Sequence, residues 1–522
     1  MMHVDGAEAG ANPLGVWREV LMASAVLDRP QVPSLDKARA FAAGHHRLFI
    51  GGQWVEPQEG RTFATHDPAT GAELARIAEA READADAAVA AARKAMDDPA
   101  WTEMKPAARA WLLLRLADAL EANADEFAAL ETLDNGMPVR DARFFHIAHA
   151  IEVLRYNAGW ATKLNGETIA LSGPGTWHAF TLREPVGVVA QIVPWNAPLA
   201  MAVAKIAPAL AAGCAVILKP AEETPLTALR LAHLIAEIGF PEGVFNLLTG
   251  FGETAGAALT AHPGVDKVTF TGSTEVGRLI LRAAAGNFKR VTLELGGKTP
   301  VIVLPDADPA KAAEGAARSI FTNAGQVCNA GSRLFVHERH FDQVIEGVAG
   351  IAEAIKLGSG FEVDTQMGPV ISAAQRDRVR GYVRQGVDAG ATLRAGGHEI
   401  DGQGYFVSPT ILTGTDETMS VRREEIFGPV LCAMSFSDED LDRIAAEANA
   451  TEYGLGAVVW TNNLSAAHRL ARKLKAGTVR VNGGGLDPAL PFGGFKQSGW
   501  GRENGREGIE AYTETKAVAI AL

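Results

Sequence analysis

The stretch Gly187-Val-Val-Ala-Gln-Ile-Val193 decides the fold, because an uncharged and mostly aliphatic run of this length predicts a strand buried on both faces. An apolar helix is expected at 199–212, followed by a second strand at Ala215-Val-Ile-Leu218. Two further strands are expected at 244–248 and 265–270. Strands that alternate with helices in this way predict a parallel α/β sheet covered by helices on both faces.

The same alternation continues on both sides of this stretch. After Gly297 it resumes with a strand at Val301-Ile-Val-Leu304, which predicts a second α/β unit. Helices are expected near 81–96, from Pro106 to Asn135-Gly136, and near 309–320, 340–356 and 371–389.

The two ends of the chain lie outside this alternation. Ala511–Leu522 alternates polar and apolar residues like a strand, and an end strand without its own sheet would expose an edge that another subunit could cover. The first 45 residues lack a basic start and a long apolar run, so a targeting peptide is not expected. They are interpreted as an extension with one short helix near 14–27.

The composition narrows the class of protein. A chain of 522 residues is long enough for two or three domains, and its 47% hydrophobic and 21% charged residues are typical of globular proteins. The formal charge of −13 argues against a nucleic-acid partner, and no apolar run approaches the roughly 20 residues that span a bilayer. The three cysteines lack the spacing of a disulfide framework or a metal site. A cytoplasmic protein without a bound metal or a membrane partner is therefore expected.

Cys328 has the clearest chemical context in the chain. It lies in the polar, glycine-rich stretch Phe-Thr-Asn-Ala-Gly-Gln-Val-Cys-Asn-Ala-Gly-Ser-Arg (321–333), whereas Cys214 and Cys432 have the apolar neighbours of core residues. Upstream, Glu294 in Leu-Glu-Leu-Gly-Gly-Lys (293–298) offers a carboxylate base. A thiol in a polar loop and a carboxylate are the parts of an enzyme that forms and then hydrolyses a thioester.

Three loops follow predicted strands, at the sheet edge where such folds bind ligands. In Phe270-Thr-Gly-Ser-Thr-Glu-Val-Gly277, backbone N–H groups could bind a pyrophosphate, or a serine or threonine could simply cap the helix. Lys219-Pro-Ala-Glu222 could accept ribose hydroxyls on its glutamate or be a solvated loop. Pro194-Trp-Asn-Ala-Pro198 could supply an oxyanion donor from Asn196 or be a plain turn.

Together these segments resemble the NAD(P)-dependent aldehyde dehydrogenase superfamily from about residue 48 to the end of the chain. The motifs stand in the family's order: Pro-Trp-Asn, Lys-Pro-Ala-Glu, Phe-Thr-Gly-Ser-Thr-Glu-Val-Gly, Glu-Leu-Gly-Gly-Lys, Gly-Gln-x-Cys, Glu-Ile-Phe-Gly-Pro and Pro-Phe-Gly-Gly-Phe-Lys. The resemblance implies an α/β fold with a Rossmann-like cofactor domain, a second α/β catalytic domain and a small β arm that forms a homodimer or homotetramer. The expected ranges are 1–45 for the extension, 46–165 and 186–296 for the NAD-binding domain, 297–490 for the catalytic domain, and 166–185 and 491–522 for the arm and C-terminal tail.

The resemblance also implies a role for each motif residue. Cys328 would be the nucleophile, Glu294 the general base and Asn196 the side-chain half of the oxyanion hole. The residues expected to contact the cofactor are Trp195, Lys219, Glu222, Gly272, Ser273, Glu425 and Phe427. The implied reaction is attack of the Cys328 thiolate on an aldehyde, transfer of hydride to nicotinamide, and hydrolysis of the thioester by water that Glu294 activates. An unperturbed thiol is mostly protonated at neutral pH, so a lowered pKa is expected for Cys328.

Two other functions compete with this one. A CoA-acylating aldehyde dehydrogenase would resolve the thioester with a thiol and would not need Glu294. A non-catalytic relative with a structural role would not need Cys328, Glu294 and Asn196 together.

Cofactor and substrate preferences follow from individual residues. A carboxylate at Glu222 would accept ribose hydroxyls and repel a 2′-phosphate, so NAD is expected over NADP, with some NADP use because Lys219 is close. Many relatives carry a bulky aromatic residue directly after the motif asparagine, whereas this chain has Ala197, with Ala200 and Ala204 on the same helix face. In the family that face lines the substrate tunnel, which implies a small-molecule substrate that is a bulky apolar or aromatic aldehyde. The alternative is that these alanines only permit close helix packing.

Overall fold

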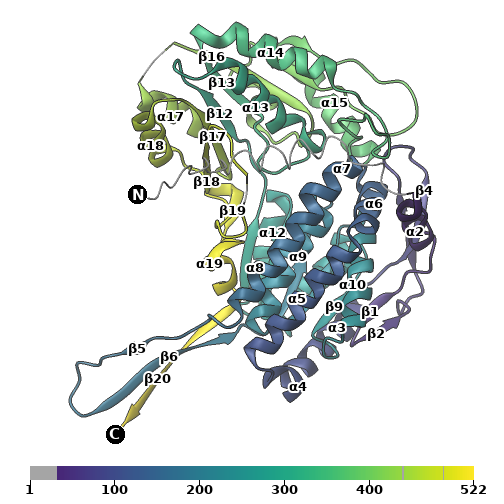
Figure 1. Ribbon diagram of the computed structural model, residues 1–522, viewed down its shortest axis with the longest axis vertical. Helices are drawn as coiled ribbons and strands as arrows, with labels where there is room; N and C mark the ends of the chain where they lie inside the picture. The colour runs from purple at the N-terminus through teal and green to yellow at the C-terminus, as the bar shows by residue number, and fades with distance from the viewer. Residues whose placement is uncertain (1–31, 438–439, 486) are drawn as a thin grey trace, which may run out of the picture.

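The structure is a computed structural model that describes residues 32–437, 440–485 and 487–522. Two large sheets form two lobes, and a narrow three-stranded sheet projects from one of them (Figure 1). The helix expected near 14–27 lies outside the described residues. Among the described residues, no helix is long and apolar enough to cross a membrane.

The first lobe is built on an eight-stranded sheet with the order β19-β11-β10-β7-β8-β9-β1-β2. Its central strands are parallel, and β7, β8 and β10 are buried at every residue, as expected for a sheet covered on both faces. The strands are β1 (Leu48–Ile50), β2 (Gln53–Val55), β7 (Val188–Ile192), β8 (Ala215–Lys219), β9 (Phe245–Leu247), β10 (Lys267–Thr271), β11 (Arg290–Glu294) and β19 (Gly499–Trp500).

The order of these strands creates a crevice. From β7 the chain proceeds through β8 to β9 on one side of the sheet, and then returns to place β10 and β11 on the other side of β7. The direction of winding therefore reverses between β7 and β10. In open α/β sheets, ligands bind outside the carboxyl ends of the strands at such a reversal.

Helices and short turns surround this sheet, and Figure 1 shows α5, α8 and α9 side by side. They are α3 (Glu82–Asp97), α4 (Pro99–Thr102), α5 (Pro106–Ala122), α6 (Ala124–Asn135), α7 (Val139–Asp141), the π-helical turn η2 (Ala142–Ile147), α8 (Ala148–Trp160), α9 (Pro198–Ala212), α10 (Leu226–Ile238), the π-helical turn η3 (Gly252–Gly256), α11 (Ala257–Ala261) and α12 (Thr274–Ala284).

The second lobe has a seven-stranded sheet with the order β14-β15-β16-β13-β12-β17-β18. Its strands are β12 (Pro300–Val303), β13 (Arg333–His337), β14 (Thr392–Ala395), β15 (Thr410–Thr413), β16 (Val430–Phe436), β17 (Gly456–Trp460) and β18 (Thr478–Val481). Its helices are α13 (Pro309–Phe321), η4 (Thr322–Gly325), η5 (Glu338–His340), α14 (Phe341–Ala354), α15 (Ala373–Asp388), α16 (Ser420–Arg423), α17 (Leu441–Asn449), α18 (Leu464–Lys473) and η6 (Lys496–Ser498). Each lobe has its own hydrophobic core. Along the chain, Leu295 belongs to the first core and Val301 to the second, so the chain passes from one lobe to the other between these residues.

The C-terminal segment contributes to the first lobe and to the three-stranded sheet. Residues 499–512 belong to the first lobe. Strand β19 pairs with β11, and Ile509, which lies in α19 (Gly505–Glu510), is part of the first core. The strand predicted at the end of the chain is β20 (Thr513–Ala521), which pairs antiparallel with β6 (Trp177–Pro185), while β5 (Thr168–Ile169) covers the far edge of β6. The strand predicted at the end of the chain therefore pairs within this chain, with β6 in the segment 166–185.

The N-terminal part of the described chain packs against the first lobe. Helix α2 (Val32–Ala42) buries Ala38 and Ala42 in the first core, and its Phe41 ring lies 5.7 Å from the ring of His233. The hairpin of β3 (Thr62–His66) and β4 (Glu73–Ala78) follows β2. Part of the predicted extension is thus integrated into the folded body.

Candidate functional site

Residues at the carboxyl ends of three neighbouring strands meet at the crevice. Asn196 follows β7, Gly272 follows β10, and Glu294 ends β11. The Gly272 N–H donates to the Glu294 carbonyl over 3.0 Å, which ties the two loops together. The fold therefore brings the predicted oxyanion donor, the predicted base and the glycine-rich loop to one edge of the sheet.

The Cys328 loop is held in an uncommon backbone conformation. Asn323 and Ala324 have φ values of 49° and 53°, in the left-handed region that non-glycine residues rarely adopt. Gly325 is also left-handed, and a Cβ there would lie 2.1 Å from the Gly428 carbonyl oxygen. Such strain persists only where surrounding contacts enforce it, and it clusters at functional sites. Cys328 itself is half-buried.

Asn196 interlocks with this loop. Its Nδ2 donates to the Gln326 carbonyl over 2.9 Å, and Asn323 Nδ2 donates to the Asn196 carbonyl over 2.8 Å. The Gln326 side-chain oxygen in turn accepts the Ile371 N–H over 2.9 Å. Because an amide carries two N–H donors, this bond leaves the second donor of Asn196 without a hydrogen-bond partner among the described residues.

Glu294 is buried without a hydrogen bond to either carboxylate oxygen within the described chain. Burial raises its pKa well above the ordinary value, the neighbouring Glu503 raises it further, and Lys205 and Arg502 oppose this. The turn after Glu294 approaches Cys328 closely, because a Cβ on Gly297 would lie 2.4 Å from the Cys328 carbonyl oxygen. A buried carboxyl with a raised pKa and free lone pairs is suited to accept a proton from water.

The environment of Cys328 contradicts one expectation. Burial, followed by the carboxylates of Glu425 and Glu294, raises the pKa of the thiol to about 12 rather than lowering it. Each of these charges opposes a thiolate, and a hydrogen bond with the Asn329 backbone acts in the opposite direction. This environment favours the thiol over the thiolate in the protein without bound ligands.

An ion pair that the sequence did not predict lies near Glu294. Lys205 of α9 and Glu503 contact each other in the buried interior, and Lys205 Nζ also donates to Thr269 Oγ1 over 3.3 Å. Glu503 is thus a second buried carboxylate beside Glu294, but it has a partner. No local pattern could have revealed this pair, because 298 positions separate its members.

Glu425 and Phe427 lie on the facing side of the crevice. Glu425 Oε1 accepts the Gly297 N–H over 3.0 Å, and burial raises the pKa of Glu425 to about 7. Phe427 has a left-handed φ of 60°, and its ring meets the Trp195 ring edge-on at 5.2 Å. These residues form a polar and aromatic wall a short distance from the thiol.

The other predicted cofactor residues lie at the ends of β8 and β10. Lys219 is buried, and its Nζ donates to the Pro220 carbonyl and, over 3.2 Å, to a carboxylate oxygen of the partly exposed Glu222. Ser273 is the N-cap of α12, with its Oγ accepting the Val276 N–H over 3.2 Å. The capping alternative is therefore correct for the Ser273 side chain, and the start of α12 still faces the crevice with its positive dipole end.

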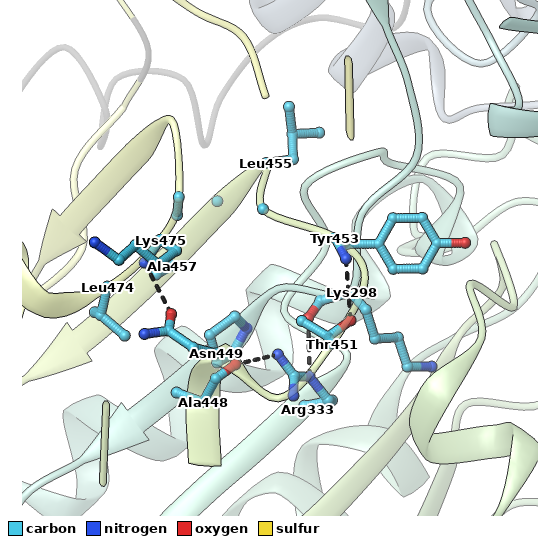
Figure 2. Close-up of a pocket in the computed structure, with 14 residues that line it drawn as sticks. Lys298, Arg333, Ala448, Asn449, Thr451, Tyr453, Leu455, Ala457, Leu474 and Lys475 are labelled. Atoms are coloured by element: carbon cyan, nitrogen blue, oxygen red, sulfur yellow. Dashed lines mark hydrogen bonds between the residues drawn. The ribbon is translucent and has the colours of Figure 1, made fainter. Parts of the chain in front are cut away.

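Two buried side chains, Arg333 and Lys298, hydrogen-bond to backbone carbonyls near the turn that follows Glu294. In Figure 2, Arg333 donates to the Lys298 carbonyl over 2.9 Å and to the Ala448 carbonyl over 2.7 Å. Lys298 Nζ donates to the Val421 carbonyl over 2.8 Å. The cavity between these residues has a volume of about 10 Å³, which is room for roughly one water. This pocket is structural support and not a substrate site.

The three alanines predicted for the tunnel begin α9. Ala197 is its N-cap, and Ala197, Ala200 and Ala204 are nearly but not completely buried. Within the described chain, no group of three His, Cys, Asp or Glu residues has the arrangement of a metal site.

Comparisons with known proteins agree with this geometry. The aldehyde dehydrogenase family matches residues 54–518. This chain belongs to that family. A phenylacetaldehyde dehydrogenase of Pseudomonas fluorescens is 52% identical over 497 residues, covering 94% of this chain and 98% of the relative. A putative aldehyde dehydrogenase of Bacillus subtilis is 50% identical over 487 residues, covering 93% and 98%.

A solved structure of similar sequence is the NAD⁺ complex of an aldehyde dehydrogenase from Bacillus cereus. It is 47% identical, covers 93% of this chain and 98% of its own, and superposes with a TM-score of 0.91. The predicted aldehyde dehydrogenase fold and enzyme class are thereby confirmed, and the family match together with this complex supports NAD as the cofactor.

Proposed function

We propose that this aldehyde dehydrogenase oxidises bulky apolar aldehydes, above all aromatic ones, to carboxylic acids with Cys328 as the nucleophile. The observation that carries the substrate class is the run of Ala197, Ala200 and Ala204 at the start of α9, directly after Asn196. Small side chains at these positions leave room for a ring beside the reacting carbon. The phenylacetaldehyde dehydrogenase relative supports the same substrate class.

In the proposed first step, the Cys328 sulfur bonds to the aldehyde carbon and its proton leaves to solvent. The carbonyl oxygen becomes an oxyanion, which Asn196 Nδ2 and the Cys328 backbone N–H stabilise as donors. The contact between Asn196 and the Gln326 carbonyl fixes one of these donors beside the thiol before the substrate arrives. Such preorganisation lowers the barrier because little reorientation is needed during the reaction.

NAD, when bound, supplies the acceptor for the hydride that leaves the tetrahedral carbon. Trp195, Lys219, Glu222, Gly272, Ser273, Glu425 and Phe427 would hold it, because they lie at or face the crevice where the strand order reverses. Loss of hydride from the Cys328 adduct leaves a thioester on the sulfur.

Glu294 then takes a proton from water, and the resulting hydroxide attacks the thioester carbon. The carbon–sulfur bond breaks, and the acid leaves while Cys328 regains its thiolate or thiol form. The free carboxylate oxygens of Glu294 and its raised pKa support this role. The buried pair of Lys205 and Glu503 tunes the charge of Glu294, because the two members shift its pKa in opposite directions.

We also propose a cytoplasmic enzyme that assembles into a homodimer or homotetramer through the arm sheet. In the sheet order, β20 has β6 on one side and no described strand on the other. Exposed apolar side chains on this sheet include Ile169, Trp177, Leu182 and Ile520. All three cysteines are free, which fits a reducing compartment.

A panel of aldehydes tests the substrate class. We expect kcat/KM for phenylacetaldehyde, benzaldehyde and hexanal to exceed that for acetaldehyde by about tenfold to a few hundredfold, because each apolar group adds about 1–3 kcal/mol of discrimination. Ala200→Phe should reduce kcat/KM for phenylacetaldehyde far more than for acetaldehyde, whereas Ala446→Phe, on the exposed face of α17, should change neither. Acetaldehyde or succinic semialdehyde as the best substrate would contradict the proposal. Turnover that requires CoA would favour the acylating alternative.

A further inference from the structure

A second polar cluster lies beside the start of α9. Glu131 of α6 is completely buried, and its Oε2 accepts the Leu199 N–H of the first turn of α9 over 3.3 Å. Its Oε1 lies 2.9 Å from His146 Nδ1 in the π-helical turn η2, so that ring nitrogen is the donor. Glu131 therefore fixes His146 next to the helix that carries the three alanines.

Along the backbone, this cluster lies close to Asn196, the proposed oxyanion donor. Leu199 is three residues after Asn196, and three residues span at most about 11 Å even when fully extended. That distance is comparable to the length of an aromatic aldehyde with a substituent on the far side of its ring. π-helical turns are also frequent at functional sites, because they redirect side chains from the regular helical positions.

His149 extends the cluster by one turn. His149 lies in the first turn of α8, three residues after His146. His149 is half-buried, and its ring makes no hydrogen bond within the described part of the chain. Burial lowers the pKa of His149, the charge of His146 lowers it further, and the carboxylate of Asp487 opposes this. Burial thus favours the neutral form of the ring, which carries one N–H donor and one acceptor nitrogen, and neither has a hydrogen-bond partner among the described residues.

The neighbourhood of His149 combines this polar group with exposed apolar side chains. Phe144 and Phe145 in η2 are 41% and 62% exposed, and Leu490, three residues after Asp487, is 57% exposed. A ligand with an apolar ring and one polar atom at its far end matches such a surface. Asp487 disfavours a carboxylate there, because two like charges repel.

We propose that His149 is a specificity-determining residue that hydrogen-bonds a hydroxyl group at the far end of the substrate, so that hydroxyaryl aldehydes are preferred over their unsubstituted analogues. A hydroxyl group both donates and accepts, which matches the free donor and acceptor of the neutral ring. This inference rests on the proposed function in one respect: it takes the aldehyde carbon to be at Cys328 and the far end to point along α9.

The test compares pairs of aldehydes that differ by one hydroxyl group: 4-hydroxyphenylacetaldehyde against phenylacetaldehyde, and 6-hydroxyhexanal against hexanal. The wild type should show a kcat/KM ratio of about three to ten in favour of the aromatic hydroxyl compound, which is the range of one net hydrogen bond. His149→Leu should lower this ratio to about one. His149→Gln, which retains a donor and an acceptor, should keep most of it. His178→Leu on β6 of the arm is the matched control and should leave both rates unchanged.

The outcomes separate this inference from the proposed function. If aliphatic aldehydes are the better substrates, the aromatic preference fails, but the ratio within the hexanal pair still tests His149. A wild-type ratio near one in both pairs, or an unchanged ratio in His149→Leu, overturns the role of His149. The Gln variant distinguishes loss of a hydrogen bond from a local folding defect, because a defect would lower the ratio in both variants.

Discussion

Glu294 and Glu503 are neighbouring buried carboxylates that differ in one respect. Glu503 contacts the buried ammonium group of Lys205, whereas Glu294 has no hydrogen-bond partner among the described residues. A buried carboxylate without a partner is costly, and such a group in a native protein calls for a functional explanation. The comparison indicates that Glu503 belongs to the structure and Glu294 is reserved for a reacting molecule.

The largest expected effect concerns the thiol of Cys328, the proposed nucleophile. Cys328→Ala should reduce aldehyde oxidation by at least about a thousandfold, because no other group can form the thioester. Calorimetric binding of NAD should persist, since the substitution leaves the crevice intact. Steady-state turnover within tenfold of the wild type would contradict the assignment of Cys328.

Substitution of each carboxylate by an amide should separate their structural roles. Glu503→Gln leaves Lys205 buried without its counter-charge and should lower the free energy of unfolding by about 3–5 kcal/mol. Glu294→Gln removes a charge that has no partner, so the free energy of unfolding should stay the same or rise. Denaturant titrations of the two variants measure this, and equal destabilisation by both would remove the distinction.

The difference in the free energy of unfolding between Glu294→Gln and the wild type should also depend on pH. The folded protein raises its pKa above the unfolded value of 4.5, so the stabilisation it contributes is complete below pH 4.5 and is lost as the pH rises through the folded pKa. The stability of Glu294→Gln relative to wild type should therefore increase as the pH rises above 4.5. A relative stability that falls over this range would show that Glu294 has an ionic partner in solution.

The carboxylates around Cys328 predict its reactivity in the free enzyme. With a thiol pKa of about 12, the rate of alkylation by iodoacetamide should rise about tenfold per pH unit between pH 7 and 10. Cys328→Ala gives the background from Cys214 and Cys432, which are fully buried. A rate that levels off near pH 8 would mean that another group stabilises the thiolate.

A smaller effect is expected at Glu222, the partly exposed carboxylate beside Lys219. Glu222→Gln should shift the ratio of kcat/KM for NADP over NAD upward by about tenfold, because it removes the charge that would repel a 2′-phosphate. The matched variant Glu253→Gln, in η3, should leave the ratio unchanged. An equal or better kcat/KM for NADP in the wild type would contradict the preference for NAD.

The sequence predicted what local patterns encode. The buried strands around Val188–Ile192 and Ala215–Lys219, and the loops with Asn196, Glu294 and Cys328, are visible because each motif is continuous in the chain. The Lys205–Glu503 pair and the raised pKa of Cys328 were not predictable, because both depend on charges brought together over long sequence separations. The residue pattern of the last strand likewise did not name its sheet partner β6, whereas the family resemblance placed residues 166–185 and the C-terminal tail together in the arm.

The most direct test of the central claim is the pre-steady-state formation of NADH in Glu294→Gln. If Glu294 is the base for hydrolysis, a burst close to one NADH per active site should precede a steady-state rate that is about a hundredfold or more below wild type. Glu503→Gln, where it folds, should retain a faster steady-state rate than Glu294→Gln. Loss of the burst in Glu294→Gln, or a wild-type steady-state rate, would contradict the assignment of Glu294 as the hydrolytic base.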